Sequence, residues 1–421
     1  MAKPYSVLMG KAVRYIARLR GGGSALPGLF VETIDKSFVA DTLAQLPRGV
    51  VLISGTNGKT TTTKMVVELL ESQGLRVFTN RTGSNFSRGV AAALLGEVDT
   101  RGRLSADIAV LELDEAHAVH FVDTVPPRYS LLLNVMRDQL DRFGEIDTTA
   151  GMLEHIARAT TGTVIVNRED ARLRAIATKL PTKNIRYFGL DASLRQQFPN
   201  DDELHGDAAA GESLPDADVV LQSVGDSATF TLDGDRVQTT LKLRGIYNIF
   251  NAAAALALTR AIVGDELDQA ALLAKLAVVQ PAFGRGETLT VDGQPCELVL
   301  VKNPAGFRLS LQSFDPTGYA TMIAINDNYA DGRDMSWLWD VDFTSLKHGV
   351  AEVSGVRAYD MALRLQYDDV PVLHANTDLP RGLSSFLTHN KNMPKRIYCT
   401  YTAMLTLRRE LAKLTTVEEI L

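Results

Sequence analysis

The sequence predicts an α/β protein built on two mainly parallel sheets, and three observations support this fold class. At 421 residues, the chain is too long for one ordinary core, so two or three domains are expected. From about residue 46 to 165, apolar runs alternate with segments of helical periodicity, as in parallel sheets covered by helices on both faces. A second series of the same kind begins near Cys296. We expect a basic N-terminal segment and linker (residues 1–45), a central domain (46–285) and a Rossmann-like C-terminal domain (286–421).

The central domain takes its strands from short apolar runs. The four candidates of the first series are Val50–Ile53, Ile108–Leu113, Tyr129–Leu133 and Thr163–Val166. Residues 191–218 then hold eight acidic side chains against one basic one, with Pro199 and Pro215, which predicts a solvated loop or a poorly ordered insertion. After it, Ala228–Leu232 and Arg236–Leu243 are predicted to pair around the turn at Asp233-Gly234.

The C-terminal domain repeats the strand and helix alternation. Its strand candidates are Cys296–Val301, Thr321–Ile325, Val350–Val353, Val370–His374 and Arg396–Thr400. Pro371 lies inside the fourth of these, so that run is expected to start a strand or to lie at a sheet edge. The last helix is predicted from Ala403 to Leu414, where apolar residues recur at helical spacing. Ligands of such sheets bind beyond the carboxyl ends of the strands, so the cleft between the domains is the expected active site.

The composition describes a soluble globular protein, with 45% hydrophobic and 22% charged residues. A net charge of −6 argues against a nucleic-acid binder. No apolar run approaches the roughly 18 residues of a membrane-spanning helix, and no signal peptide is visible. Cys296 and Cys399 form neither a disulfide framework nor a zinc pattern. The reducing cytoplasm is therefore the expected compartment.

The N-terminal segment is unusually basic. The first 31 residues carry five basic side chains and no acidic one, and apolar residues interleave with them at roughly helical spacing. Residues 21–24, Gly-Gly-Gly-Ser, predict a flexible joint after this segment. Two interpretations stay open: a peripheral contact with the inner face of the plasma membrane, or a helix packed on the central domain.

The most informative motif is a glycine-containing turn between a buried strand and a helix. Glycines let backbone N–H groups approach phosphate, the helix N-terminus adds positive potential, and a lysine neutralises β/γ charge. Ile53 occupies the place of the first glycine of the strict phosphate-loop motif, so the loop is the shorter G-x-x-G-K-T form. The residues expected to bind ATP here are Gly55, Thr56, Asn57, Gly58, Lys59, Thr60 and Thr61.

Carboxylates for Mg²⁺ are expected after the next strand of the series. Mg²⁺ prefers oxygen ligands and usually takes only one or two from protein. The Thr60 hydroxyl is one predicted ligand, and either Glu112 or Glu115 is the predicted carboxylate. A structural alternative is that these acids cap the following helix.

The short phosphate loop resembles that of the Mur ligase family, the ATP-dependent enzymes of peptidoglycan precursor assembly and folate polyglutamylation. Residues 134–143 resemble a family element whose histidine helps bind a second Mg²⁺, and Gln139 takes that place here. Many members carry a carbamylated lysine further on, where this chain has Glu154. We expect Glu154 to supply that negative charge directly. Residues 80–85 resemble a family loop around nucleotide and precursor.

Two further elements extend the resemblance. Residues 245–253 resemble the G-x-[HY]-N-x-x-N-x-x-A-A element, in which Asn248 and Asn251 would contact nucleotide and nearby backbone; bracing of a helix is the alternative role. Phe283 to Glu287 matches the G-R-x-E element at the domain join. Its Arg285 is suited to fork onto phosphate or ribose, with a structural salt bridge as the alternative.

Four stretches narrow the resemblance to the MurT branch of this family: the Thr-Asn-Gly-Lys-Thr-Thr-Thr loop and residues 137–145, 302–306 and 326–334. MurT proteins are synthetase subunits of lipid II isoglutaminyl synthases. The resemblance implies that ATP activates the α-carboxylate of D-Glu in the lipid II stem peptide as an acyl phosphate, which ammonia converts to D-isoglutamine. It also implies a glutaminase partner, GatD, docked on the C-terminal domain. Asp334 would complete its Cys–His pair in trans, since a carboxylate fixes a histidine tautomer and stabilises the imidazolium.

The chain departs from the MurT pattern in one respect. MurT proteins commonly carry a four-cysteine zinc ribbon in the middle domain, whereas the corresponding acidic stretch here has no cysteine, so no zinc is expected. Two other functions remain as alternatives. One is an amino-acid-adding ligase of the Mur or folylpolyglutamate type. The other is a nucleotide-dependent binding module without ligation.

Overall fold

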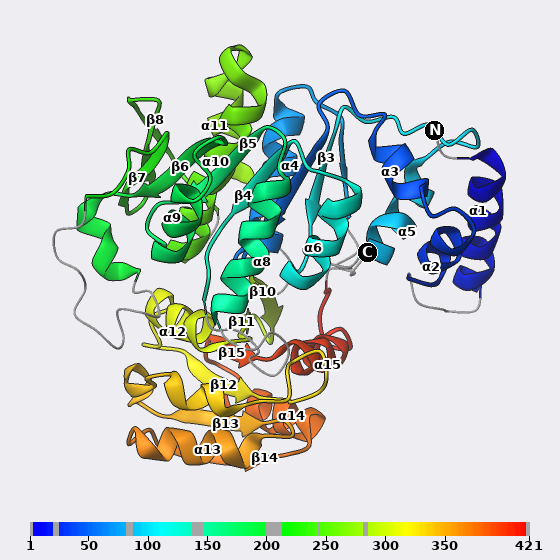
Figure 1. The fold of residues 1–421 in the computed structure, drawn as a ribbon. Helices are drawn as coiled ribbons and strands as arrows, with labels where there is room; N and C mark the ends of the chain where they lie inside the picture. The colour runs from blue at the N-terminus through cyan, green and yellow to red at the C-terminus, as the bar shows by residue number, and fades with distance from the viewer. Residues whose placement is uncertain are drawn as a thin grey trace.

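The computed structural model describes residues 3–19, 25–80, 87–136, 146–198, 213–242, 245–280 and 285–417. Two sheets dominate these residues, and each is the centre of a domain (Figure 1). Most neighbouring strands within them are parallel. The predicted α/β class is confirmed.

The central sheet draws its strands from residues 50–239 and runs in the order β2-β3-β1-β4-β5-β6-β7-β8-β9. Pairing is parallel as far as β7 and antiparallel across β7, β8 and β9. The strands are β1 (Val50–Ser54), β2 (Val77–Thr79), β3 (Ile108–Glu112), β4 (Tyr129–Leu132), β5 (Thr163–Asn167), β6 (Asn184–Leu190), β7 (Val219–Val224), β8 (Ala228–Leu232) and β9 (Asp235–Thr239). The carboxyl ends of β1, β3 and β4 are adjacent, so the segments after them meet at one edge.

Helices cover both faces of this sheet and bury two apolar cores. They are α3 (Phe38–Leu43), α4 (Lys59–Ser72), α5 (Ser87–Glu97), α6 (Glu115–Thr124), α8 (Ile146–Ala159), α9 (Ala171–Thr178), α10 (Ile246–Val263) and α11 (Gln269–Val278), with short 3-10 turns η1 (Ala192–Gln197) and η2 (Gly264–Glu266). In length and apolar composition α10 would suffice to cross a membrane, the one such helix in the described part of the chain, which corrects the expectation that no apolar run approaches that length. It packs instead against α4 and the central sheet, and Ala252 to Leu258 are almost wholly buried.

The C-terminal sheet has the order β10-β11-β15-β12-β13-β14 and is parallel apart from β10. Its strands are β10 (Arg285–Val291), β11 (Gln294–Leu300), β12 (Ala320–Ala324), β13 (Val350–Ser354), β14 (Val372–Asn376) and β15 (Lys395–Cys399). The helices are α12 (Pro304–Ser313), η3 (Ser336–Asp340), η4 (Thr344–Leu346), α13 (Ala358–Tyr367), α14 (Leu379–His389) and α15 (Tyr401–Leu411). As Pro371 predicted, β14 begins just after the proline and lies at the sheet edge.

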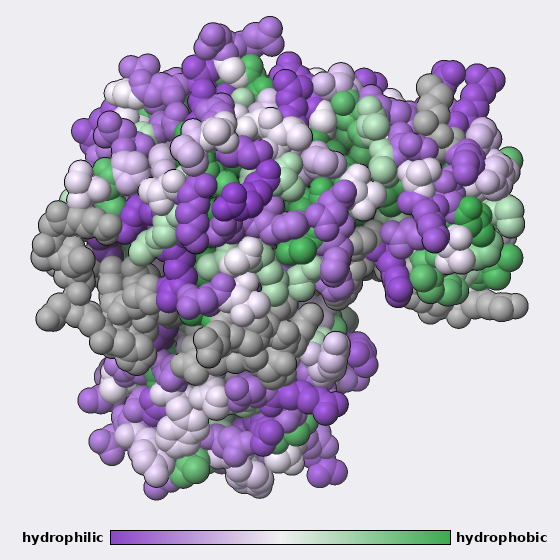
Figure 2. All heavy atoms as spheres, viewed as in Figure 1, coloured by the Kyte–Doolittle hydropathy of each residue, from purple (hydrophilic) through white to green (hydrophobic). Residues whose placement is uncertain are grey.

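The basic segment folds into two helices, α1 (Pro4–Leu19) and α2 (Ala25–Ile34), which pack on each other and on α5. This agrees with the interpretation as helices packed on the central domain. Together they form a lobe at one end of that domain, and Figure 2 shows the surface hollowed between this lobe and the C-terminal domain. The joint predicted at residues 21–24 lies outside the described residues.

Four strands escaped the sequence prediction, namely β2, β6, β7 and β10. β2 has only three residues, and β6 carries Asn184 and Arg186, so neither resembles a buried apolar run. The acidic stretch is only partly a loop, because Asp191 caps η1 by accepting a hydrogen bond from the Ser193 N–H. Residues 199–212 of that stretch lie outside the described residues.

Candidate active site at the junction of the domains

The phosphate loop is shaped by two glycines that no other residue could replace without strain. Gly55 and Gly58 have φ angles of +130° and +90°, a region that side chains rarely enter. A Cβ at Gly58 would also lie 2.7 Å from Oδ1 of Asn251 on α10. No side chain caps the N-terminus of α4 at Gly58. Its first N–H groups therefore face the loop, as an anion-binding helix terminus requires.

The loop is held in place from the end of β4. The Asn57 N–H donates to Oδ1 of Asn134 at 2.8 Å, and Nδ2 of Asn134 donates back to the Asn57 carbonyl at 2.9 Å. The Thr56 hydroxyl accepts from the Met136 N–H and donates to the Met136 carbonyl. Asn134 thus acts as a rigid clamp on the loop backbone. From the sequence alone Asn134 is only part of a family motif, because the pairing of β1 with β4 is a tertiary feature.

Lys59 forms a buried ion pair with Glu115, the first residue of α6. The Lys59 Nζ lies 3.0 Å from Oε1 of Glu115, and both side chains are less than a tenth exposed. Burial lowers the pKa of Lys59, but the nearby carboxylates outweigh it and the pKa ends above its ordinary value. Burial likewise raises the pKa of Glu115, but Lys59 outweighs it and holds that pKa below its ordinary value. Both groups are therefore charged, and the lysine also donates to the Gly55 carbonyl.

The other carboxylate meets the predicted metal-binding threonine. The Thr60 hydroxyl donates to Oε1 of Glu112 at 2.8 Å. The Asn80 side chain fixes the Glu112 backbone by accepting from its N–H and donating to its carbonyl. The two carboxylates that the sequence left as alternatives thus have different partners, Glu112 with Thr60 and Glu115 with Lys59. A hydroxyl and a carboxylate in contact form an oxygen pair of the kind Mg²⁺ takes from proteins.

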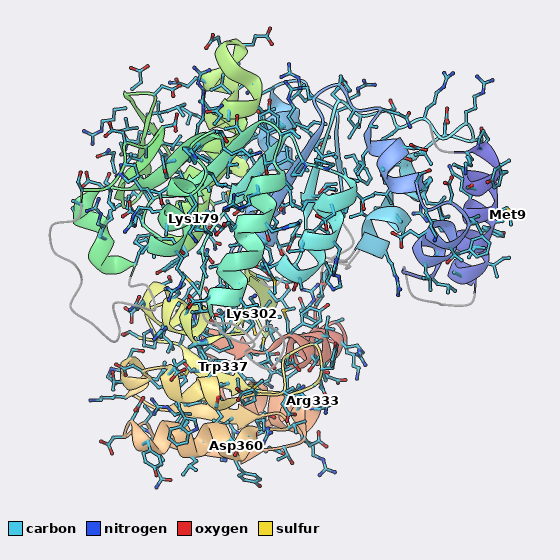
Figure 3. The ribbon with its side chains drawn as sticks, viewed as in Figure 1. Met9, Lys179, Lys302, Arg333, Trp337 and Asp360 are labelled. Carbon is cyan, nitrogen blue, oxygen red and sulfur yellow. The ribbon has the colours of Figure 1, made fainter. Side chains whose placement is uncertain are left out.

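The C-terminal domain reaches the loop from the opposite side. The Lys302 Nζ donates to the Thr56 carbonyl at 3.0 Å, and the Asn303 Nδ2 donates to Oδ1 of Asn57 at 3.1 Å. Asn303 also caps α12 by accepting from the Gly306 N–H. Figure 3 shows Lys302 at the junction of the two domains. From the sequence alone residues 302–306 are only a family signature, since their contact with the loop depends on domain packing.

A pocket opens beside these contacts, between the domains. Its walls come from the loop, from the start of α10 and from α12 with its flanking residues. Among the residues lining it are Asn57, Gly58, Asn134, Tyr247, Asn248, Asn251, Lys302, Gly306, Ser310 and Phe314. The two asparagines of the α10 element are thus brought to the phosphate loop, as the nucleotide-binding interpretation requires.

For two other predicted site residues, Arg285 and Gln139, the side chains lie outside the described part of the structure. Arg285 begins β10, where its backbone pairs with Val299, and its side chain is outside the description. Gln139 lies outside the described residues. Within the ranges that the structure covers, no cluster of three or more His, Cys, Asp or Glu side chains could hold a metal ion. The Thr60 and Glu112 pair would therefore need ligands from substrate or water.

Glu154 has basic side chains as partners in the structure. Its carboxylate lies on α8 and accepts hydrogen bonds from Arg158, one turn further along, and from Lys179 at 3.0 Å. These partners hold the pKa of Glu154 below its ordinary value. Lys179 lies well apart from Lys302 in Figure 3. The structure thus pairs Glu154 with two basic side chains, one of them in an i to i+4 ion pair, and its role at the metal site stays a prediction from the family resemblance.

Asp334 lies in the C-terminal domain on the segment between β12 and η3. Two other acids of this segment are structural: Asp331 is buried and accepts from the Thr402 N–H at 2.7 Å, and Asp327 pairs with Arg357 at the start of α13. Asp334 is half-buried, and its Oδ1 accepts from the Ser336 N–H at 2.9 Å. Asp334 therefore lies on the segment that follows the carboxyl end of β12, in the C-terminal domain.

Comparison with known proteins agrees with this geometry. Residues 53–259 match the Mur ligase middle domain, and residues 300–404 match the MurT ligase C-terminal family. The MurT subunit of the glutamine-hydrolyzing lipid II isoglutaminyl synthase from Streptococcus pneumoniae is 31% identical over an alignment of 445 positions. The alignment covers 96% of each chain. The chain belongs to the MurT family.

Other relatives place the MurT family in a wider fold. The MurT subunit from Staphylococcus aureus is 28% identical over 87% of this chain and 88% of its own. Among solved structures, MurF ligase from Thermotoga maritima in complex with ADP has a TM-score of 0.69 at 18% identity, covering 91% and 83% of the two chains. Folylpolyglutamate synthase from Mycobacterium tuberculosis has a TM-score of 0.63 at 17% identity, covering 91% and 95%. The last two likenesses concern the fold alone.

Proposed function

We propose that this MurT family protein is the ATP-dependent synthetase subunit of a lipid II isoglutaminyl synthase. It would amidate the α-carboxylate of D-Glu in the lipid II stem peptide to give D-isoglutamine. The observation that carries the proposal is the match to a named MurT subunit along 96% of both chains. The phosphate loop, with its buried lysine and facing carboxylates, supports the ATP-dependent step.

Residues from both domains would bind the nucleotide. The β- and γ-phosphates would lie on the N–H groups at the start of α4, where Lys59 exchanges part of its contact with Glu115 for phosphate oxygens. Asn248 and Asn251 would face the rest of the nucleotide in the pocket. Lys302 would meet the transferred phosphate from the C-terminal side, since it already reaches the loop carbonyl of Thr56.

The Thr60 hydroxyl and the Glu112 carboxylate are the residues we assign to Mg²⁺, because they are in contact and the Asn80 side chain fixes the Glu112 backbone. Bound there, the ion would neutralise charge on the phosphates. Glu115 would instead keep Lys59 charged. A role for Gln139 in a second metal site stays a proposal from the family resemblance.

The reaction would proceed in two transfers. An oxygen of the substrate carboxylate attacks the γ-phosphorus and ADP leaves, which forms an acyl phosphate. Ammonia then attacks the acyl carbon, the C–O bond to phosphate breaks, and the amide forms with release of inorganic phosphate and a proton. The closed contact between Asn303 and Asn57 would shield the acyl phosphate from water.

Ammonia would come from a glutaminase of the GatD type, docked on the C-terminal domain. An exposed apolar surface supports this assignment, and we call it the α13 face. It consists of Trp339, Tyr359, Leu363, Tyr367 and Leu373, each about half to two-thirds exposed. The segment that bears Asp334 is tied to the start of α13 by the Arg357–Asp327 pair. Asp334 would orient the glutaminase histidine from there.

We assign the protein to the cytoplasm, at the inner face of the membrane that holds a lipid-linked substrate. The test is amidation of lipid II by the purified chain with ATP, Mg²⁺ and ammonium, with ADP and isoglutamine measured together. We expect one ADP per amide, and amidation from glutamine only when the glutaminase is added. Addition of an amino acid in place of ammonia would instead support the ligase alternative, and nucleotide binding without turnover would support a binding module.

Two lysine variants, one in the phosphate loop and one outside it, test the role of the loop in this assay. Lys59→Ala should reduce ADP release and amidation together by at least roughly 100-fold, because transition-state charge on the phosphates loses its buried cation. Lys64→Ala, one turn further along α4, removes the same charge outside the loop and should stay near wild type. Equal activity of wild type and Lys59→Ala would overturn the proposal.

A further inference from the structure

The segment that bears Asp334 leaves the C-terminal sheet beside the start of α15. We call residues 325–335, between β12 and η3, the Asp334 loop. The loop follows the carboxyl end of β12, and α15 begins directly after the carboxyl end of β15. β12 and β15 are parallel neighbours, so the loop and the first turn of α15 meet at one edge of the sheet. Figure 3 labels Arg333 of this loop in the C-terminal domain.

Thr402, the second residue of α15, joins the helix to the loop. Its hydroxyl donates to Oδ2 of Asp331 and accepts from Nδ2 of Asn326 at 3.1 Å and from Nδ2 of Asn328 at 2.8 Å. A threonine hydroxyl has one proton and two lone pairs, so these contacts use its full hydrogen-bonding capacity. The Thr402 N–H also donates to Oδ1 of Asp331 at 2.7 Å. One residue of α15 therefore holds three residues of the Asp334 loop.

The buried carboxylate of Asp331 strengthens this anchor. Asp331 is 3% exposed, and its Oδ2 also accepts from the Asn328 N–H at 3.1 Å. At the N-cap of α15, the Thr400 hydroxyl accepts from the Asn326 N–H at 2.9 Å instead of from its own helix. Asp331 thus supplies a negative charge and an acceptor to the helix N-terminus from outside the helix. Charge-assisted hydrogen bonds of this kind are about twice as strong as neutral ones.

A second anchor follows Asp334. Met335 is buried in the apolar core under η3, and Arg364 of α13 donates to two backbone carbonyls just beyond it. On the other side of Asp334, Gly332 turns the chain away from Asp331 with a φ angle of +85°. The short stretch that carries Asp334 is therefore fixed at both ends, by α15 before it and by the core after it.

We infer that Thr402 is a positioning residue, which through Asp331 holds Asp334 where it meets the histidine of the glutaminase partner. The inference rests on the proposed function, because it assumes the role of Asp334 in trans. A carboxylate must lie within hydrogen-bond distance of an imidazole N–H to fix the tautomer. Misplacement by about 1 Å can reduce a rate roughly 100-fold. The contacts with the phosphate loop come instead from Lys302 and Asn303, which precede α12, so the ATP-dependent step should not need Thr402.

The test measures glutamine hydrolysis and amidation by the complex of the full chain with its glutaminase. Thr402→Val keeps the shape and the backbone N–H but removes the hydroxyl. We expect kcat for glutamine hydrolysis to fall roughly tenfold, with KM for glutamine and amidation from ammonium near wild type. Thr402→Ser should restore kcat. Thr406→Val is the control, because that hydroxyl, one turn further along α15, donates to the Thr402 carbonyl of its own helix, and this variant should match the wild type.

A milder variant and a binding measurement test the same anchor. Asn328 is exposed, so Asn328→Ala removes one donor to the Thr402 hydroxyl and should lower the same kcat by a smaller factor. The Kd of the two subunits, measured by calorimetry, should stay at its wild-type value in both variants. Wild-type kcat in Thr402→Val and Asn328→Ala would overturn the inference. Weaker binding of the glutaminase, or loss of amidation from ammonium, would contradict a positioning role as well.

A double variant separates this inference from the proposed function. Thr402→Val combined with Asp334→Asn should hydrolyse glutamine no more slowly than Asp334→Asn alone, because a positioning residue acts through the residue that it positions. Additive losses would show that Thr402 acts by another route. If Asp334→Asn keeps wild-type glutaminase activity, the role in trans is refuted and the inference falls with it. If Asp334→Asn loses that activity and Thr402→Val keeps it, the proposed function stands and the inference alone fails.

Discussion

The buried pair of Lys59 and Glu115 gives the sharpest test of the site electrostatics, through the variant Glu115→Gln. Glutamine keeps the shape and one acceptor for the lysine but removes the charge. The two side chains are 9% and 6% exposed, and 3.0 Å separates Nζ from Oε1. Removing one partner of a buried ion pair costs roughly 3–5 kcal/mol, and the retained acceptor favours the lower end, about 3 kcal/mol. For a domain of this size that corresponds to a fall in Tm of about 6–12 °C.

Nucleotide should recover part of this loss. The triphosphate supplies negative charge beside Lys59, so bound nucleotide replaces the missing carboxylate. A saturating ligand stabilises by RT ln(1 + [L]/Kd), about 2.7 kcal/mol at one hundred times Kd. The rise in Tm on adding Mg²⁺ and a non-hydrolysable ATP analogue should therefore be larger in Glu115→Gln than in the wild type.

The assay is thermal unfolding followed by circular dichroism, with and without the nucleotide analogue. Glu154→Gln is the control, because it also removes a carboxylate between basic side chains, but Arg158 and Lys179 are more than half exposed. Pairs of that kind contribute about 0–1 kcal/mol. If Glu115→Gln lowers Tm no more than Glu154→Gln does, the buried pair is not the electrostatic centre of the loop.

Three further predictions address the clamp, the partner and the pH dependence. Asn134→Ala removes two hydrogen bonds to the Asn57 backbone, together worth about 2 kcal/mol. It should therefore raise the KM for ATP roughly tenfold. An unchanged KM would show that the loop keeps its shape without Asn134. Asp334→Asn should abolish amidation from glutamine in the complex but keep amidation from ammonium, and retained glutaminase activity would reject its role in trans. The Arg76 hydrogen bonds hold the pKa of Asp107 below its ordinary 3.8, so its stabilisation is present above pH 3.8 and is lost as pH falls through the folded-state pKa. Asp107→Asn should therefore lower Tm by about 2 °C at pH 7, and thermal melts should show that difference closing below pH 3.8; a constant difference would contradict the linkage.

Much of the fold and of the loop could be predicted because it depends on local sequence. The runs that became β1, β3, β4 and β5 are mostly apolar and buried along their whole length, since parallel strands are covered on both faces. The glycines, Lys59 and Thr60 follow one strand directly, so their spacing in the sequence predicts a phosphate-binding loop. By contrast β6 escaped notice because it is half covered and carries polar residues. The partners of Glu154 cannot be read from the sequence either, because Lys179 follows a different helix, 25 positions further along the chain.

The sequence by itself determined the α/β class, the phosphate loop, the basic character of the N-terminal segment and the resemblance to the MurT branch. Only the tertiary structure decided which carboxylate meets which partner: Glu112 contacts Thr60, and Glu115 neutralises Lys59. It also brought Asn134 and Lys302 to the loop, 77 and 246 positions away along the chain from the residues they contact. The physical reason is that strand order and domain packing place the ends of distant segments at one edge of a sheet. Contacts between such segments cannot be predicted from a local pattern of residues.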